Sequence, residues 1–204
     1  MGSVLMINAS PRAPRYNSKR YAQLFAKHYP GQAEYVELTG KNHAQLCGKL
    51  EEVTHLLLVF PLYADALPVT LMHFLKALEE HPPRKKRPMI SVLINCGFYE
   101  YAQNDIAVQM VRLFCAQNQY PFGSVLEIGS GEAILDSPFR MFAEGKIKKL
   151  AKGIAAGRHQ ALHVTMPIPR KMFVNASTQY WINYGKRFGT SKEQMQTMEI
   201  EAEQ

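Results

Sequence analysis

Polar donors gather near the start of this chain, directly after a run of apolar residues. The apolar run 3–8 predicts a buried strand, and Asn17 and Ser18 stand at the head of an amphipathic helix expected over 17–29. Ser10 and Arg12 lie between the two. Hydroxyl, amide and guanidinium groups would thus meet the positive end of a helix, an arrangement that binds phosphate or another anion. An ordinary helix cap is the alternative, because Asn and Ser are preferred there.

A second loop, residues 61–68, follows another buried strand. It begins with Pro61, Leu62 and Tyr63 and ends in a second proline. The prolines restrict its course, and the leucine and tyrosine offer a flat apolar surface that suits an aromatic ring system. Simple packing of the tyrosine is the alternative.

A third loop begins at Asn95 and continues through Gly97, Phe98 and Tyr99. The glycine allows the backbone to approach a ligand closely, and the asparagine and backbone N–H groups can bond the rim of a heterocycle. A fourth loop, residues 129–132, is flexible in composition and can flank the same site or a partner subunit.

Two residues of these loops are interpreted as structural. Asp65 is expected to cap the next helix. Cys96 is read as a small residue at a tight turn, because a thiol nucleophile needs a neighbouring base or cation. The histidines nearest in sequence fall elsewhere in the pattern, at His55, His73 and His81.

Apolar periodicity predicts an alternation of strands and helices along the chain. Strands are expected at 3–8, 34–38, 54–60, 89–94 and 124–128, and helices at 17–29, 43–52, 69–80, 105–117 and about 138–156. Spacing assigns inward faces to Leu71, Met72, Leu75 and Leu78, and to Ile106, Met110, Leu113 and Phe114. Such an alternation predicts an α/β fold, a doubly wound parallel sheet with helices on both faces.

One domain is expected over 1–160, with a C-terminal extension, 161–204, that packs on the same domain. The segment 164–189 breaks the alternation with two prolines and an aromatic stretch, 180–184, and it is expected to pack a short helix on the domain. Alternatively, the aromatic stretch 180–184 contacts a second subunit instead of its own domain.

Composition narrows the class of protein. The chain has 204 residues, 47% of them hydrophobic, and a formal net charge of +7. Its three cysteines are scattered and form no C-x-x-C pair, which favours a reducing, cytoplasmic location and argues against a disulfide framework or a metal site. The longest apolar run is too short to span a bilayer, so no membrane partner is expected. No nucleic-acid motif accompanies the charge, so nucleic acid is not expected either.

Taken together, the three loops resemble those of the flavodoxin-like superfamily, in its NAD(P)H-dependent FMN reductase and quinone reductase branch. The matching segments are Ala9-Ser10-Pro11-Arg12 with Asn17-Ser18, then Pro61-Leu62-Tyr63 with Leu67-Pro68, then Asn95-Cys96-Gly97-Phe98. The resemblance spans about residues 3–130. The chain departs from the pattern at Ala9, where the family usually has glycine, and in a slightly longer stretch before Asn17.

The resemblance implies a five-stranded sheet of order 2-1-3-4-5 that binds FMN without a covalent bond. It places the phosphate at Ser10, Arg12, Asn17 and Ser18. The isoalloxazine ring would lie between Pro61, Leu62 and Tyr63 on one side and Asn95, Gly97, Phe98 and Tyr99 on the other. It further implies NADPH or NADH as electron donor, a quinone, flavin or similar small molecule as acceptor, and allows a homodimer. No catalytic side chain and no metal ligand is assigned, because the cofactor carries the redox chemistry.

Two alternative functions are compatible with the same fold. A flavodoxin-type electron carrier would also bind FMN, although such carriers are typically acidic and this chain is basic. A binding module without flavin is the second alternative.

Overall fold

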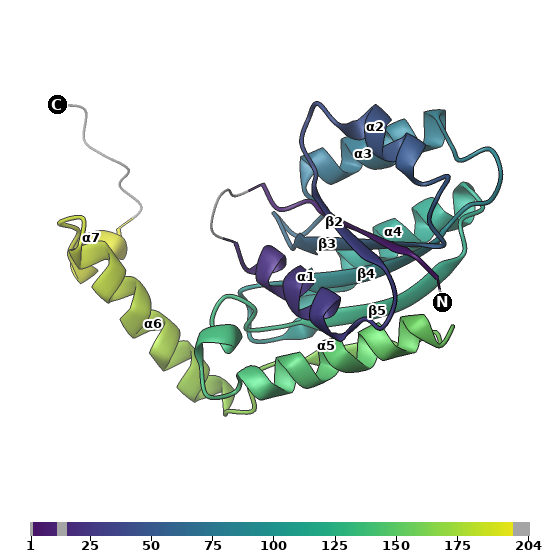
Figure 1. The fold of residues 1–204 in the computed structure, drawn as a ribbon. Coiled ribbons are helices and arrows are strands. Elements are labelled where there is room, and N and C mark those ends of the chain that lie inside the picture. The colour runs from purple at the N-terminus through teal and green to yellow at the C-terminus, as the bar shows by residue number, and fades with distance from the viewer. Residues whose placement is uncertain (1, 12–15, 198–204) are drawn as a thin grey trace, which may run out of the picture. The chain divides into compact units, whose positions relative to one another are not determined.

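The computed structural model describes residues 2–11 and 16–197. The chain divides into two compact units, Met1–Met166 and Pro167–Gln204. The first unit holds a single parallel sheet of six strands in the order β2-β1-β3-β4-β5-β6 (Figure 1). The strands are β1 (Val4–Asn8), β2 (Ala33–Glu37), β3 (His55–Pro61), β4 (Met89–Asn95), β5 (Phe122–Ile128) and β6 (Ala161–Val164).

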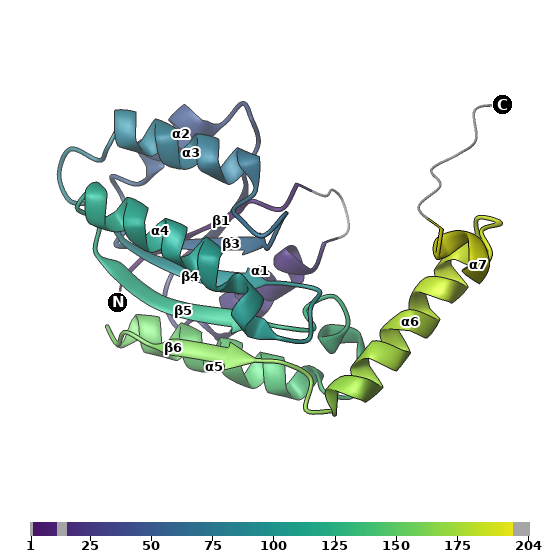
Figure 2. The ribbon, with the colours of Figure 1, turned by 180° about the vertical axis from the view of Figure 1, so that it is seen from behind.

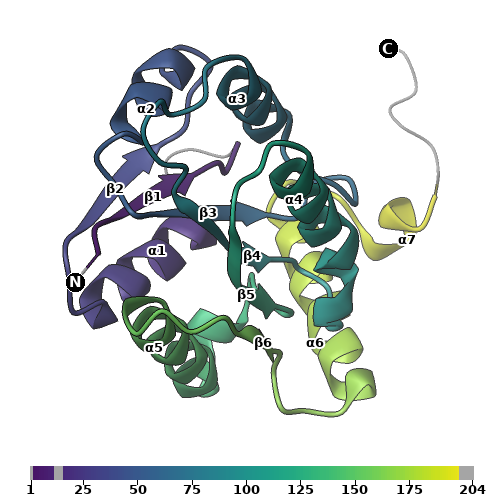
Figure 3. The same ribbon diagram turned by 90° about the vertical axis from the view of Figure 1, so that its right-hand side faces the viewer.

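Helices cover both faces of this sheet. Figures 1 and 2 show α1 (Asn17–His28) and α5 (Arg140–Ala155) on one face. The other face carries α2 (His43–Lys49), α3 (Val69–Glu80) and α4 (Asp105–Gln117), as Figure 3 shows along the sheet. Two short 3₁₀ turns, η1 (Tyr101–Asn104) and η2 (Ile134–Asp136), follow β4 and β5. The α/β class and the doubly wound arrangement predicted from the sequence are therefore confirmed.

The prediction of five strands was wrong, because β6 adds a sixth strand beside β5. Its register pairs Val125 with Ala161 and Ile128 with Val164. Only Leu162 and Val164 of its four residues are buried, so β6 is a short edge strand with one solvent-exposed face. The strand has only four residues, and only two of them point inward. The alternation of apolar and polar residues is therefore too short to be recognised in the sequence.

The core lies between the central strands and the helices. All five residues of β1 are buried, and so are the middle five of β3. This follows from parallel strands that are covered on both faces and therefore need apolar residues throughout.

The assigned inward faces of α3 and α4 were partly wrong. Met72 is 44% exposed, Ile106 63% and Leu113 58%. In α4 the smaller residues face the sheet instead, and they are Ala107, Val108, Val111 and Cys115. Apolar residues surround α4 on more than one side, so its pattern alone does not select a face.

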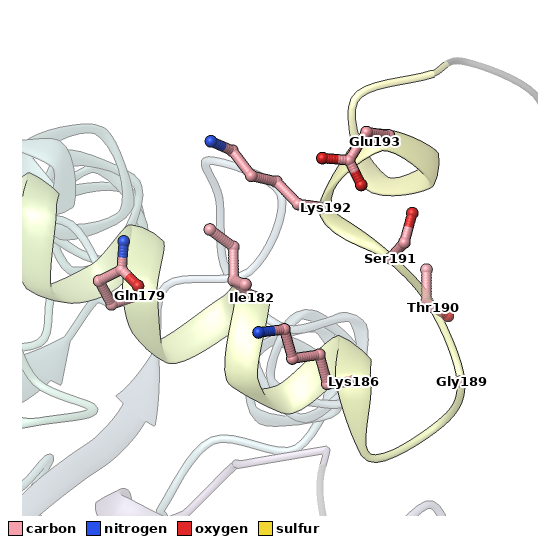
Figure 4. Close-up of a pocket in the computed structure, with 8 residues that line it drawn as sticks. All are labelled: Gln179, Ile182, Lys186, Gly189, Thr190, Ser191, Lys192 and Glu193. Atoms are coloured by element: carbon pink, nitrogen blue, oxygen red, sulfur yellow. The ribbon is translucent and has the colours of Figure 1, made fainter.

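The second unit contains α6 (Arg170–Lys186) and α7 (Lys192–Met195). The helix α6 runs for 17 residues, so the expectation of a short helix was wrong, and none of its residues is buried. Its aromatic rings contact one another, with centroids 5.8 Å apart for Trp181 and Tyr184 and 5.1 Å for Tyr184 and Phe188. Figure 4 shows a groove within this unit, between one side of α6 and the turn that leads into α7. A capping box between Ser191 and Gln194 fixes that turn.

Among the described residues, no helix has both the length and the apolar character needed to cross a bilayer.

Candidate functional site

The three loops selected from the sequence leave neighbouring strands at one edge of the sheet. The register places Asn8 beside Val59, and Pro61 beside Asn95. Strand order reverses at β1, because β2 lies on one side of it and β3 on the other. In open parallel sheets, ligands bind at such a reversal, beyond the carboxyl ends of the strands. The loops after β1, β3 and β4 therefore surround one position.

The first of these loops leads into α1. The backbone N–H of Ser10 donates to Oδ1 of Asn8 at 3.1 Å. The N-cap residue of α1 is Tyr16, whose side chain accepts no hydrogen bond from the helix, and no acidic residue lies in the first turn. Within the described part of the chain, the first N–H groups of α1 therefore keep their capacity to bind an anion. Arg12, assigned to the phosphate, lies outside the described residues.

Both basic side chains of this first turn have acidic partners. Nζ of Lys19 lies 3.0 Å from Oε1 of Glu37. Arg20 donates to both carboxylate oxygens of Asp136, at 2.9 and 2.6 Å. The hydrogen bonds from Arg20 hold the pKa of Asp136 below its ordinary value. These pairs attach α1 to β2 and to η2, and they partly neutralise the cations next to the loop.

A buried hydrogen bond joins α1 to β4. The Ser18 hydroxyl donates to Oδ1 of Asn95 at 3.0 Å, and the two residues are 1% and 4% exposed. Asn17, beside it, donates to the Glu132 carbonyl at 3.3 Å and accepts from Arg20 at 2.9 Å. The structure thus brings Asn17, Ser18 and Asn95 together, but it directs the Ser18 hydroxyl toward Asn95.

The second loop forms a tight hairpin. Tyr63 and Ala66 exchange backbone hydrogen bonds of 3.2 and 3.1 Å, and the two residues between them have positive φ angles of 48° and 57°. Asp65 is the second of these, so the expectation that it caps α3 was wrong. The N-cap of α3 is Pro68, and no side chain caps this helix by a hydrogen bond.

Two aromatic side chains remain open to solvent at this edge. Tyr63 is 51% exposed and Phe98 53%. Pro61, Leu62 and Tyr99 are half-buried, and the N–H of Leu62 donates to the Asn95 carbonyl at 2.8 Å. The second and third loops are therefore joined at their bases, and each carries an exposed ring of the kind that stacks on a planar ligand.

Cys96 lies inside the third loop and is 3% exposed. Burial raises the pKa of its thiol to about 11, so the thiolate is scarce near neutral pH. Cys96 is thus a poor nucleophile, in agreement with its structural interpretation from the sequence.

The fourth loop, after β5, contributes more to the site than its sequence suggested. A Cβ at Gly131 would lie 2.9 Å from Cβ of Asn95 and 3.0 Å from the Cys96 carbonyl oxygen. The Tyr21 hydroxyl donates to the Gly131 carbonyl at 2.7 Å. Glu132 lies over Gly97, where a Cβ would be 3.5 Å from its carboxyl carbon. Two glycines within four residues were the only sequence signal for this close approach.

These features fit FMN. The uncapped first turn of α1 suits a phosphate, and the exposed rings of Tyr63 and Phe98 suit a planar heterocycle.

Comparison with known proteins supports the fold. No protein-family model matches the chain. No curated protein matches it either. Among solved structures, an NADPH-quinone reductase from P. pentosaceus superimposes with a TM-score of 0.57 at 14% identity, covering 75% of this chain and 97% of that one.

Two further structures agree. An NAD(P)H:quinone oxidoreductase from Methanothermobacter marburgensis gives a TM-score of 0.59 at 12% identity, over 75% of this chain and 96% of that one. An FMN-dependent NADH-azoreductase from Bacillus anthracis str. Ames Ancestor, in complex with FMN, gives 0.55 at 13% identity, over 76% and 100%. At these identities the likeness establishes a shared fold, which is the doubly wound α/β arrangement described above.

Proposed function

We propose that this chain is a cytoplasmic, FMN-dependent oxidoreductase that uses NADPH or NADH to reduce a quinone, a flavin or a similar small acceptor. The observation that carries the proposal is the convergence, at one edge of the sheet, of the uncapped α1 N-terminus with two exposed aromatic side chains, Tyr63 and Phe98. The quinone reductases and the azoreductase named above share this fold, which adds support.

The residues divide into those that would hold the phosphate and those that would hold the ring. The first N–H groups of α1, with Ser10, Arg12 and Asn17, would bind the phosphate. Ser18 belongs to this set through its hydrogen bond to Asn95, which positions the start of the third loop.

Pro61, Leu62 and Tyr63 would contact one side of the ring system, and Gly97, Phe98 and Tyr99 the other. Bound FMN would supply the redox chemistry by accepting a hydride from the nicotinamide and passing electrons to the acceptor. The surrounding backbone dipoles would stabilise negative charge on the pyrimidine edge, and the aromatic side chains would exclude water. No side chain is required as a general acid or base.

The proposal includes a homodimer. The exposed aromatic residues of α6 give the second unit a surface for such a contact, and light scattering of the purified protein would measure the mass directly.

The deciding experiment is flavin binding followed by turnover. We expect purified protein to retain FMN after desalting, with a shifted visible spectrum, and to oxidise NADPH or NADH when a quinone is added. The double variant Tyr63→Ala/Phe98→Ala should weaken FMN binding by about tenfold or more, because each aromatic contact contributes about 1 kcal/mol. Leu113→Ala removes a similarly exposed apolar side chain from α4 and serves as the matched control.

The alternatives give different results. Retained FMN without turnover on any acceptor would favour an electron carrier. Failure to bind FMN, in protein that unfolds cooperatively, would contradict the proposal and favour a flavin-free binding module.

A further inference from the structure

The end of β6 contacts the third loop from across the sheet. β6 is the edge strand beside β5 (Figure 2), and Thr165 directly follows it. The Thr165 hydroxyl donates to the Tyr99 carbonyl at 2.5 Å, a contact between residues 66 positions apart in the chain. Two residues earlier, the imidazole of His163 stacks on the Tyr101 ring, with centroids 4.2 Å apart and planes 10° from parallel. The sixth strand therefore supports both the third loop and the η1 turn that follows it.

Ser130, in the fourth loop, is hydrogen-bonded to the same region. Its hydroxyl oxygen lies 2.8 Å from Oγ1 of Thr165. Because the single hydrogen of the Thr165 hydroxyl is donated to Tyr99, the Ser130 hydroxyl is the donor in this pair. The backbone N–H of Ser130 donates to the Phe98 carbonyl at 2.5 Å. Two successive carbonyls of the third loop are thus each held by a donor, and the two donor residues are hydrogen-bonded to one another.

The backbone of Ser130 explains what its side chain contributes. Ser130 is 1% exposed and has a φ angle of 53°, in the left-handed region that glycine occupies more readily than serine. A glycine would adopt this turn without strain, but it would lack the hydroxyl that reaches Thr165. Serine therefore adds to the turn a buried hydrogen bond that links the fourth loop to the end of β6.

The backbone of the third loop determines where the Phe98 ring is presented. That side chain is 53% exposed, so packing against the protein does little to fix its direction. The carbonyl of Phe98 is held by Ser130, and the next carbonyl along the chain is held by Thr165. Hydrogen bonds on two consecutive peptide groups restrict the backbone dihedral angles between them, and with them the direction of the exposed ring.

We propose that Thr165 and Ser130 are positioning residues for the flavin ring. The hydrogen-bonded chain from Ser130 through Thr165 to the Tyr99 carbonyl holds the third loop so that Phe98 faces the isoalloxazine. Both residues act through the backbone of the loop. The inference rests on the proposed function, and it gives the sixth strand a role in the site, because β6 ends at the residue that reaches the loop.

The first test measures the affinity for FMN and for riboflavin by fluorescence titration. Thr165→Val keeps the shape of the side chain, but it leaves the Tyr99 carbonyl without this donor and the Ser130 hydroxyl without this acceptor. We expect the affinity for both flavins to fall by about fivefold to tenfold. Thr165→Ser keeps the hydroxyl and should bind within about twofold of wild type. The ratio of the two affinities should not change, because the phosphate that riboflavin lacks is proposed to bind at α1.

Two further variants make this test specific. Thr54→Val is the matched control, because the Thr54 hydroxyl donates to the Ser3 carbonyl at 3.0 Å just before β3, at the opposite end of the sheet. It should leave both affinities unchanged. Ser130→Gly removes the other hydroxyl and suits the positive φ angle. Its loss of affinity should be smaller than that of Thr165→Val, since Tyr99 keeps its donor, and it tests the proposal independently of the valine variant.

The second test needs no flavin. The amides of Ser130 and Gly131 donate to the carbonyls of Phe98 and Cys96, so their hydrogen exchange reports separation of the third and fourth loops. Exchange of these two amides should be about fivefold faster in Thr165→Val than in wild type. It should remain at the wild-type rate in Thr165→Ser and in the control variant.

The outcomes distinguish this inference from the proposed function. Unchanged exchange and unchanged flavin affinity in Thr165→Val would refute the positioning role. Faster exchange in a protein that binds neither flavin in any form would overturn the proposed function, and the role in flavin binding with it. Faster exchange with wild-type affinity would leave the proposed function standing and overturn the positioning role. A serine variant as weak as the valine variant would show that packing of the Thr165 methyl group, and not its hydroxyl, supports the loop.

Discussion

The hydrogen bond between Ser18 and Asn95 shows how single residues support this site. Each has a side chain that can bind a ligand directly, and each is almost fully buried in contact with the other. Their bond fixes the first turn of α1 against the end of β4, which are the two places where we propose that the phosphate and the ring bind. A buried polar pair of this kind contributes mainly because either partner alone would be left unsatisfied.

Ser18→Ala is therefore expected to destabilise the protein by about 1–3 kcal/mol, because Oδ1 of Asn95 then lacks its donor. Urea unfolding at constant pH measures this change. Gln109→Ala, at an exposed position of α4, is the control and should change stability by less than about 0.5 kcal/mol. Equal effects of the two substitutions would contradict a structural role for the Ser18 hydroxyl.

At the scale of elements, the site depends on the close approach of the loop after β5 to the end of β4. The N–H of Gly131 donates to the Cys96 carbonyl at 2.7 Å, and the N–H of Ser130 donates to the Phe98 carbonyl at 2.5 Å. The loops after β4 and β5 are thereby joined beyond the edge of the sheet. The glycine at position 131 is needed because neighbouring backbone and side-chain atoms occupy the space of a Cβ.

Gly131→Ala should consequently reduce stability by about 1–3 kcal/mol through overpacking, and it should weaken FMN binding if the proposed function holds. Gly145→Ala is a matched control on α5, where a Cβ would meet no atom within 4 Å. That substitution should stabilise the protein by about 0.5–1 kcal/mol through helix propensity. Thermal and urea unfolding measure both, and a neutral Gly131→Ala would show that the fourth loop is free to move.

At the scale of the whole molecule, the buried apolar core of the described residues lies between Val4 and Met166. The second unit holds an aromatic helix, α6, with no buried residue of its own. A sheet covered on both faces has the closed core that a domain needs, whereas a lone helix of this length is marginal in water. The first unit therefore has the physical requirements of an independent domain.

A chain that ends at Met166 should accordingly keep its α/β circular dichroism spectrum and unfold cooperatively. We expect its free energy of unfolding to lie within about 1 kcal/mol of the full-length value, because no buried core residue is removed. A much larger loss would instead support the proposal that residues 161–204 pack on the domain. Full-length Leu113→Ala, also altered at an exposed position, gives the reference for a neutral change.

Local pattern was sufficient for the elements with strong periodicity. The bounds of α3 and α4 agree with the predicted 69–80 and 105–117, and the five longer strands lie where apolar runs or, for β2, polar–apolar alternation predicted them. The order of the three loops at strand ends followed from the same pattern. Such features depend on residues close in sequence, where turn chemistry and side-chain period act directly.

Only the tertiary structure decided the features that depend on distant residues. The edge strand β6, the outward position of Ile106 and the bond between Ser18 and Asn95 all depend on contacts between residues far apart in the sequence. The sequence alone therefore determined which segments become strands and helices, while packing determined which side chains meet, because burial and hydrogen bonding are settled between elements and not within them.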